Sequence, residues 1–200
     1  MCVRGGHLVT VVTAFATAYL LGSIPTSYIV VYLFTGRDVR SIGNGNPGAM
    51  NVWDNVGLAP AALVAIGDIG KGMAAVSVAY LLGLHDTQAV IAALLAIAGH
   101  DYSIFLWFQG GNGTAAAIGG LFALVPTATG PAAAIAVALY MLTGSKRLSG
   151  VIALLCVPLF AYLAAYPDVK IIGVLLVLTV TAVKIIRFEG FTPERSRPPR

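Results

Sequence analysis

Long apolar runs separated by short polar segments constrain the fold of this chain more than any other feature. Five runs are clear, over residues 8–34, 56–84, 87–108, 149–166 and 169–186. A membrane-spanning helix needs about 20 mostly apolar residues. Charged residues make up 10% of the chain, whereas a soluble domain carries roughly 25% to wet its surface. The sequence therefore predicts an all-α integral membrane protein, a single polytopic membrane domain over residues 1–200.

The apolar stretch over residues 114–143 is ambiguous because Pro126, Gly130 and Pro131 lie near its middle. Proline removes a helical hydrogen bond and clashes with the preceding turn. The stretch is either one kinked span or two short helices. The first reading gives six transmembrane helices, and the second gives a compact bundle of about seven.

The distribution of basic residues favours seven helices. Cytoplasmic loops of membrane proteins are enriched in Lys and Arg. With seven helices, 9 of the 12 basic residues lie on one side and 2 on the other, with Lys71 inside a span; with six, the division is 8 to 3. The nine are Arg37, Arg40, Lys146, Arg147, Lys184, Arg187, Arg195, Arg197 and Arg200. We expect the N-terminus outside and both the C-terminus and residues 36–55 in the cytoplasm.

Composition also excludes several functions. The net charge of +4 comes from short loops and a tail, so we expect no nucleic-acid partner. Two cysteines, Cys2 and Cys156, exclude a disulfide framework and a thiolate metal site. The first 21 residues lack a small-residue cleavage site, which favours a retained membrane segment over a signal peptide.

Polar residues inside the apolar runs are the first candidates for function, since polar groups are costly in lipid. The segment GSIPTSY, from Gly22 to Tyr28, interrupts the first run at a proline and is typical of a packed kink. Asp68 and Lys71 share a helix face at i and i+3, either as a structural ion pair or with Lys71 directed at an anionic substrate. His100 lies near the end of the third run and is either a packing residue or a catalyst.

Two turns rich in Gly and Asn form the second group of candidates. Residues 36–55 read GRDVRSIGNGNPGAMNVWDN, and residues 109–113 read QGGNG immediately before a helix beginning at Thr114. Left-handed backbone at Gly and Asn can turn successive N–H groups inward to bind an anion. A helix N-terminus does the same. With seven helices both turns lie on one side of the membrane, which favours a shared phosphate site over two unrelated loops.

These motifs, in this order, resemble the bacterial acyl-phosphate-dependent glycerol-3-phosphate acyltransferase family. The resemblance covers about the first 120 residues well and is specific as an ordered set. It rests on the motifs GSIP from Gly22, GRDVR from Gly36, GNGNPGAMN from Gly43, Asp68-x-x-Lys71-Gly72, Gly99-His100 and FQGGNG from Phe108.

The resemblance implies a seven-helix bundle in the bacterial plasma membrane with its active site facing the cytoplasm. It implies transfer of an acyl group from acyl phosphate to glycerol 3-phosphate, giving lysophosphatidic acid for phospholipid synthesis. It implies no metal, no cofactor and no covalent acyl-enzyme. Besides these substrates and membrane lipid, it names no protein partner.

Candidate site residues follow from the matching motifs. We expect His100, Lys71 and Asp68 to be catalytic, with His100 a candidate general base and Lys71 a source of positive charge. The expected phosphate cradle consists of Asn44, Gly45, Asn46, Gly48, Asn51, Gly110, Gly111, Asn112 and Gly113.

The chain departs from the family pattern at several positions. Asn44, Met50, Asp54 and Asn112 stand where the family has Ser, Thr, Arg and Lys, and Val180 and Val183 stand near the positions of a family His and Asn. Neutral hydrogen bonds hold phosphate less strongly than charge-assisted ones. Two alternatives therefore stay open: a catalytically degenerate paralogue that binds a lipid precursor or partners an active enzyme, and a small solute transporter with broken helices.

Overall fold

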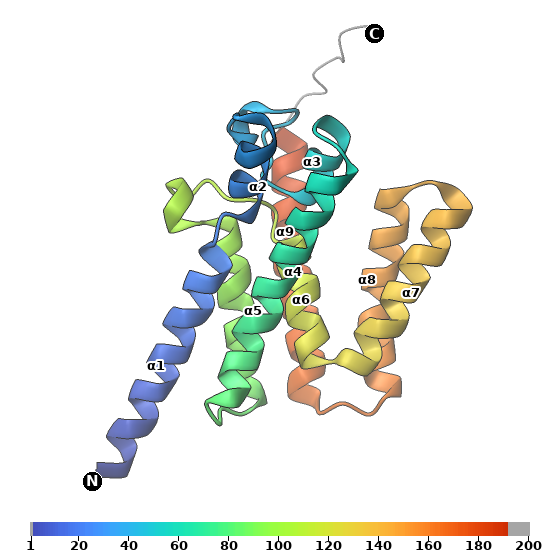
Figure 1. Ribbon diagram of the computed structural model, residues 1–200. Helices are drawn as coiled ribbons and strands as arrows, with labels where there is room; N and C mark the ends of the chain where they lie inside the picture. The colour runs from blue at the N-terminus through green and yellow to red at the C-terminus, as the bar shows by residue number, and fades with distance from the viewer. Residues whose placement is uncertain (1, 192–200) are drawn as a thin grey trace, which may run out of the picture.

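The structure, a computed structural model, describes residues 2–191 and contains only helices and connecting turns within that range. The helices are α1 (Cys2–Ser23), α2 (Thr26–Thr35), α3 (Ala49–Asn55), α4 (Leu58–Leu81), α5 (Asp86–Asp101), α6 (Thr114–Leu124), α7 (Pro126–Thr143), α8 (Lys146–Leu163) and α9 (Asp168–Phe191), with short 3-10 helices η1 (Val39–Ser41) and η2 (Ile104–Leu106). The predicted all-α class is confirmed (Figure 1).

Six segments of the described chain are long and apolar enough to cross a membrane. They comprise α1 with α2 as one unit, α4, α5 extended to η2, and α7, α8 and α9. The 11-residue α6 is the additional short apolar helix. Together they give the seven-helix arrangement that the sequence favoured.

The ambiguous stretch is two helices. α6 ends at Leu124, and Pro126 is the first residue of α7, where its missing N–H costs no hydrogen bond. Figure 1 shows α6 and α7 running in opposite directions from this junction. The reading as one kinked span is wrong, whereas Pro131 stays inside α7 without ending it.

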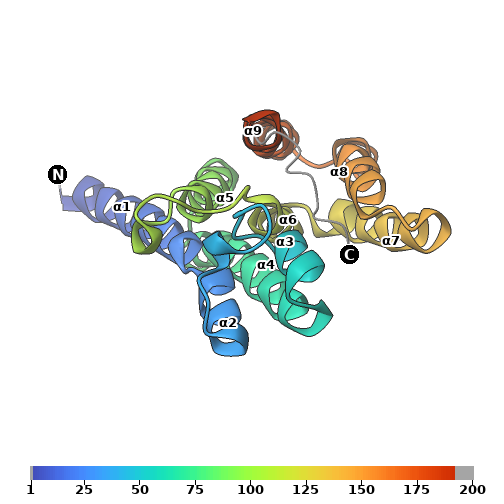
Figure 2. The same cartoon turned by 90° about the horizontal axis from the view of Figure 1, so that it is seen from above.

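The first apolar run is also divided, because α1 ends at Ser23 and α2 begins at Thr26. Pro25 lies in the junction, and α2 turns away from the direction of α1 (Figure 2). A small core, formed by Val31, Val39, Ile42, Val52, Ala61 and Val64, packs α2, η1 and α3 against the start of α4. This core fixes the 36–55 segment at one end of the bundle.

Tight contacts between small residues hold the main bundle together. A Cβ on Gly72 of α4 would meet the backbone of Ala116 in α6, and one on Gly22 of α1 would meet the backbone of Ala96 in α5. Such close approach is common where lipid supplies no hydrophobic drive for helix association. Gly70, by contrast, has open space beside it.

The two ends of the bundle carry different connections. Figure 1 shows residues 36–57, the α7–α8 turn and the end of α9 at one end. The α4–α5, α6–α7 and α8–α9 turns lie at the other end, together with the start of α1. The start of α1 and the end of α9 are therefore at opposite ends of the bundle.

Candidate active site

The junction between α1 and α2 presents backbone carbonyls that accept side-chain hydrogen bonds at the centre of the site. Proline at position 25 breaks the helix, so the preceding carbonyls lose helical partners. Lys71 Nζ donates to the Ile24 carbonyl at 2.9 Å, and Ser103 Oγ donates to the Ser23 carbonyl at 2.5 Å. The GSIP motif is thus held by side chains from α4 and from the segment after α5.

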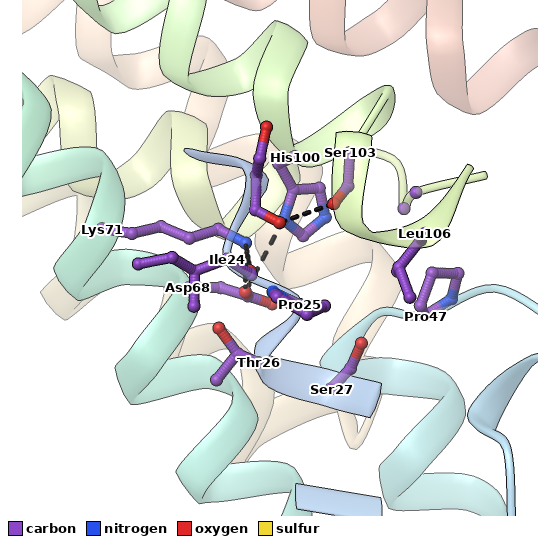
Figure 3. A pocket seen from close by; sticks show the side chains of 13 residues that line it. Ile24, Pro25, Thr26, Ser27, Pro47, Asp68, Lys71, His100, Ser103 and Leu106 are labelled. Carbon is purple, nitrogen blue, oxygen red and sulfur yellow. Dashed lines mark hydrogen bonds and ion pairs between the residues drawn. The ribbon is translucent and has the colours of Figure 1, made fainter. Parts of the chain in front are cut away.

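Asp68, Lys71 and His100 form one buried polar cluster (Figure 3). Lys71 Nζ lies 2.9 Å from Asp68 Oδ1, and His100 Nδ1 lies 3.6 Å from the same oxygen. The side chains of Asp68 and Lys71 are 1% and 6% exposed. Asp68 Oδ2 has no hydrogen-bond partner within the described structure, and His100 Nδ1 has none besides its long contact with Asp68 Oδ1. The cluster is therefore paired in charge but has unused hydrogen-bonding capacity.

A small cavity adjoins this cluster, with about 10 Å³ of space for the centre of a water molecule. Its wall combines the α1–α2 junction, Asp68 and Lys71 from α4, His100 from α5, and Ser103 and Leu106 from the segment that follows α5. Pro47 closes it from the first turn, and Gly110 and Gly111 close it from the second. This space is close to the smallest volume that holds one water molecule and far below the roughly 300–1,000 Å³ of drug-sized ligand sites.

The two Gly/Asn turns lie side by side at this cavity. A Cβ on Gly111 would approach the Pro47 carbonyl to 3.2 Å and would also collide with His100 Nε2. Glycine at position 111 is therefore required for the second turn to pack between the first turn and the imidazole. The expectation that both turns share one end of the bundle is confirmed.

Five of the predicted site residues line the cavity: Asp68, Lys71, His100, Gly110 and Gly111. Seven others lie nearby but outside its lining: Asn44, Gly45, Asn46, Gly48, Asn51, Asn112 and Gly113. The cavity is therefore a different arrangement from an open cradle formed by all nine turn residues.

Asn51 organises the first turn from inside. Its Nδ2 donates to the carbonyls of Ile42 and Asn46, each at 3.0 Å, and its Oδ1 accepts from Asn44 N and from Asn55 Nδ2. Gly45 N donates to the Ile42 carbonyl. These bonds lie within the turn, so the backbone groups that make them already have partners inside the turn.

The second turn is hydrogen-bonded to the end of α5. Gly110 N donates to the Asp101 carbonyl at 3.1 Å, and Gly111 N donates to the His100 carbonyl at 3.2 Å. Gly113, with φ of 69°, begins α6 in a left-handed conformation. The buried side-chain oxygens of Asn46 and Asn112 have no hydrogen-bond partner within the described structure. The N–H groups in the first turn of α6 also lack intrahelical acceptors, as in every helix.

Several substituted family positions lie outside the lining of the cavity. Asp54 Oδ1 pairs with Lys146 Nζ at 2.7 Å, and that ammonium lies 3.8 Å above the Trp53 ring. This contact joins α3 to the start of α8. Met50, Val180 and Val183 are exposed.

Near the first turn, the carboxylate of Asp38 is paired with Arg40 by bonds of 2.6–3.1 Å. Asp38 also accepts from the backbone N–H of Arg40 at the start of η1. The hydrogen bonds from the Arg40 guanidinium hold the pKa of the Asp38 carboxyl below its usual range. Arg40 is therefore occupied by a protein carboxylate.

Sequence reasoning missed the role of Ser23, Ser103 and Leu106 in the cavity wall. Ser23 was assigned only to a packed kink. The signal that pointed to it was the density of hydroxyl residues at a proline break within an apolar run. Among the described side chains, no group of three or more His, Cys, Asp or Glu is placed to hold a metal ion.

Comparison with known proteins identifies the family. The glycerol-3-phosphate acyltransferase family model matches residues 12–190. The chain belongs to this family. Its relatives include glycerol-3-phosphate acyltransferase 2 of Dehalococcoides mccartyi strain ATCC BAA-2266, 39% identical over 90% of this chain and 85% of the relative. Another is the glycerol-3-phosphate acyltransferase of Desulforudis audaxviator, 38% identical over 74% and 75%.

Two solved structures share the fold. One is the integral membrane glycerol 3-phosphate acyltransferase PlsY (YgiH) in its glycerol 3-phosphate form, with a TM-score of 0.81 and 26% identity over 90% of each chain. The other is the lysophosphatidic acid form of the same protein, with a TM-score of 0.78 and 25% identity over 90% of each chain. The family fold therefore extends through α7, α8 and α9, beyond the motif-bearing first 120 residues.

Proposed function

We propose that this chain transfers an acyl group from acyl phosphate to glycerol 3-phosphate, giving lysophosphatidic acid and inorganic phosphate for phospholipid synthesis. Family membership over residues 12–190 supports acyl transfer to glycerol 3-phosphate. Acyl phosphate as the donor rests on the resemblance and on the chemistry of the site. The single observation that carries the mechanism is the cavity in which Asp68, Lys71 and His100 meet both glycine-rich turns.

His100 is placed to accept the proton of an attacking hydroxyl. Its Nδ1 faces Asp68, whereas its Nε2 lies beside Gly111. A carboxylate facing one ring nitrogen favours the tautomer protonated there, which leaves the other nitrogen as a proton acceptor. The Nδ1 to Asp68 distance of 3.6 Å is long, as catalytic hydrogen bonds often are without substrate. Asp68 then acts as a positioning residue and Lys71 balances its charge.

The proposed step is a direct displacement. The hydroxyl oxygen attacks the acyl carbonyl carbon while its proton moves to His100 Nε2, and the bond between that carbon and the phosphate oxygen breaks. Phosphate leaves with the bonding electron pair. Acyl phosphate is already activated, so holding the reacting atoms about 3 Å apart supplies much of the rate without a covalent enzyme intermediate.

For the phosphate groups we propose the region between the turns and the start of α6. The whole set predicted from sequence, residues 44–51 and 110–113, surrounds this region. Within it, the α6 N-terminus offers free N–H groups and a favourable dipole. The unengaged side-chain atoms of Asn46 and Asn112 are amide oxygens, which accept hydrogen bonds and do not donate to phosphate. Gly45, Gly110 and Gly111 would contribute N–H groups only after releasing the carbonyls they now bind.

We also propose that the site faces the cytoplasm from the bacterial plasma membrane. Arg37, Arg40, Lys146 and Arg187 belong to the end of the bundle that carries the two turns, whereas Lys170 lies at the opposite end (Figure 1). An excess of Lys and Arg is typical of cytoplasmic loops.

The test is a turnover assay on the purified protein with palmitoyl phosphate and glycerol 3-phosphate, following lysophosphatidate by mass spectrometry and phosphate release in parallel. We expect product, and we expect His100→Ala to lower the rate by about 10²- to 10⁴-fold as loss of a general base does. The matched control is His85→Ala in the α4–α5 turn, which should leave the rate unchanged.

Three results would contradict the proposal. Product formed only from palmitoyl coenzyme A would refute the donor. Binding of glycerol 3-phosphate without product would indicate a degenerate paralogue. Uptake of glycerol 3-phosphate into liposomes without chemistry would indicate a transporter.

A further inference from the structure

Lys184 is a charged residue inside the last spanning segment, and the mechanism proposed above does not use it. The segment ends at Arg187, and Lys184 is the only charged residue between Lys170 and Arg187. Charged side chains within spanning helices are rare and usually mark a substrate or ion site. A Lys near a helix end can instead extend to the aqueous interface. The surroundings of the Lys184 ammonium decide between these two roles.

The Lys184 side chain is half-buried and lies against the segment that follows α5. Its Nζ lies 4.0 Å from the centre of the Tyr102 ring. Tyr102 directly follows Asp101, whose carbonyl accepts the hydrogen bond from Gly110 N. The ammonium is therefore held at the base of the second turn rather than extended into water.

A buried carboxylate connects Lys184 electrostatically with the start of α6. Asp101 is 3% exposed, and its Oδ1 has no hydrogen-bond partner within the described structure. A Cβ on Gly113, the residue before α6, would lie 2.7 Å from this oxygen. Lys184 and Lys71 are the cations that act on the Asp101 carboxyl. Without Lys184, the negative charge beside the start of α6 would be less well balanced and would repel a phosphate group.

The contacts of Lys184 differ from those of other basic side chains at this end of the bundle. Three of those are each paired with a carboxylate at 2.6–2.9 Å: Arg40, Lys71 and Lys146. The described contact of Lys184 is with a neutral ring, which leaves its N–H donors available to an anion. Asn112, where the family has Lys, gives the second turn no charge of its own. Lys184 therefore brings to this turn the positive charge that position 112 lacks.

We propose that Lys184 is a substrate-binding residue that supplies the positive charge for a substrate phosphate at the second turn. The inference rests on the proposed function, because it takes phosphate to bind between the turns and the start of α6. The Lys184 ammonium moves from the Tyr102 ring to a phosphate oxygen, and the N–H groups at the start of α6 donate to the others. A charge-assisted hydrogen bond from α9 thus replaces the one that a Lys at position 112 would make from the turn itself.

The first test is kinetic. Lys184→Met should lower kcat/KM by about 10- to 100-fold, the scale of one lost hydrogen bond to a charged group, whereas Lys184→Arg should keep most of the activity. Measuring KM separately for glycerol 3-phosphate and for palmitoyl phosphate shows which of the two phosphates Lys184 binds. Lys170→Met, the same change at the opposite end of α9, is the matched control and should leave kcat/KM unchanged.

The second test moves the charge. Adding Asn112→Lys to Lys184→Met returns a cation to the second turn and should recover about tenfold or more in kcat/KM. Adding Asp101→Asn instead removes the buried negative charge without supplying a cation, and it should recover less. If Lys184→Met does not fold, the Asp101→Asn and Lys184→Met double variant, which leaves no unbalanced carboxylate, becomes the background for Asn112→Lys.

A third readout is independent of turnover. The unfolding temperature of the detergent-solubilised protein is measured with glycerol 3-phosphate or with dodecyl phosphate, an unreactive mimic of the donor, and with glycerol or dodecanol as the uncharged control. At least one phosphate should stabilise wild type more than its alcohol does. Lys184→Met should lose this excess, and Asn112→Lys should restore it.

The outcomes separate this inference from the proposed function. Loss and recovery of phosphate stabilisation without any turnover would support the role of Lys184 and contradict the proposed reaction. A Lys184→Met protein with wild-type kinetics and stabilisation would overturn the inference. Recovery through Asp101→Asn but not through Asn112→Lys would show that Lys184 only neutralises Asp101, which overturns it as well.

Discussion

Replacing Lys71 with Met should destabilise the protein strongly, because it leaves a buried carboxylate without its cation. Asp68 is 1% exposed, and after the change its nearest titratable neighbour is His100 at 3.6 Å. Breaking a buried ion pair by removing one partner costs about 3–5 kcal/mol. The Ile24 carbonyl also loses its 2.9 Å bond from Lys71, worth roughly a further 1 kcal/mol.

The double variant Asp68→Asn with Lys71→Met tests the origin of this loss. It removes both charges, so no uncompensated charge stays buried, and we expect most of the stability to return. Replacing a whole buried pair by uncharged side chains is often close to neutral. The double variant should therefore lose less than the sum of the two single losses by at least about 3 kcal/mol, the upper end of the range found for contacting residues. The double variant should stay inactive, which separates folding from catalysis.

The assay is unfolding in mixed micelles of increasing sodium dodecyl sulfate content, followed by the fluorescence of Trp53 and Trp107. Lys170→Met is the matched control, since its pair with Asp86 at 3.3 Å is at the other end of the bundle and partly solvated. Its cost should stay below about 1 kcal/mol. The reasoning would be refuted by a Lys71→Met protein as stable as wild type, or by a double variant whose loss equals the sum of the two single losses.

Three further predictions concern other parts of the structure. Gly72→Ala should push α4 away from Ala116 and cost about 1–3 kcal/mol in the same titration, whereas Gly70→Ala has open space and should stabilise by up to about 1 kcal/mol. The Asp38 carboxyl has a lowered pKa in the folded protein. Its stabilising effect is therefore complete above the pKa of the unfolded chain and is lost as the pH falls through the pKa of the folded protein. Limited proteolysis of the 36–48 segment across an acid pH series should show this loss of protection in wild type and not in Asp38→Asn. Asp54→Asn should keep wild-type kcat/KM and change stability by less than about 1 kcal/mol, because Asp54 pairs with Lys146 outside the cavity; a large change in KM for glycerol 3-phosphate would show that position 54 serves the substrate.

The sequence was sufficient for the fold where hydropathy and proline decide it. Apolar runs of spanning length predicted the long helices, and Pro126 marked the junction at which α6 ends and α7 begins. The break at Pro25 was visible as well, because a proline and several hydroxyl residues interrupt an apolar run. These signals depend only on residues close together in the chain, so they can be read from a single sequence.

The site was predictable only in part, because its hydrogen bonds are not local. Glycine and asparagine showed that the turns could present N–H groups. Only the structure shows that Gly110 and Gly111 already donate to the end of α5, and that Asn51 holds the first turn together. Likewise, Asp54 stands where the family has Arg, and only the structure shows its partner on α8, 92 residues away.

The short length of α6 sets the depth of the glycine turn that precedes it. Eleven residues give about 16 Å of helix, roughly half of a 30 Å hydrocarbon layer. Because α6 ends at the bundle end opposite the first turn, its beginning and the adjacent glycine turn lie part-way down (Figure 1). Under the proposed function, an activated acyl donor bound at that depth would be shielded from bulk solvent, so that its hydrolysis would be slow relative to acyl transfer. The hydrophilic acceptor, in turn, has to leave the aqueous phase to react.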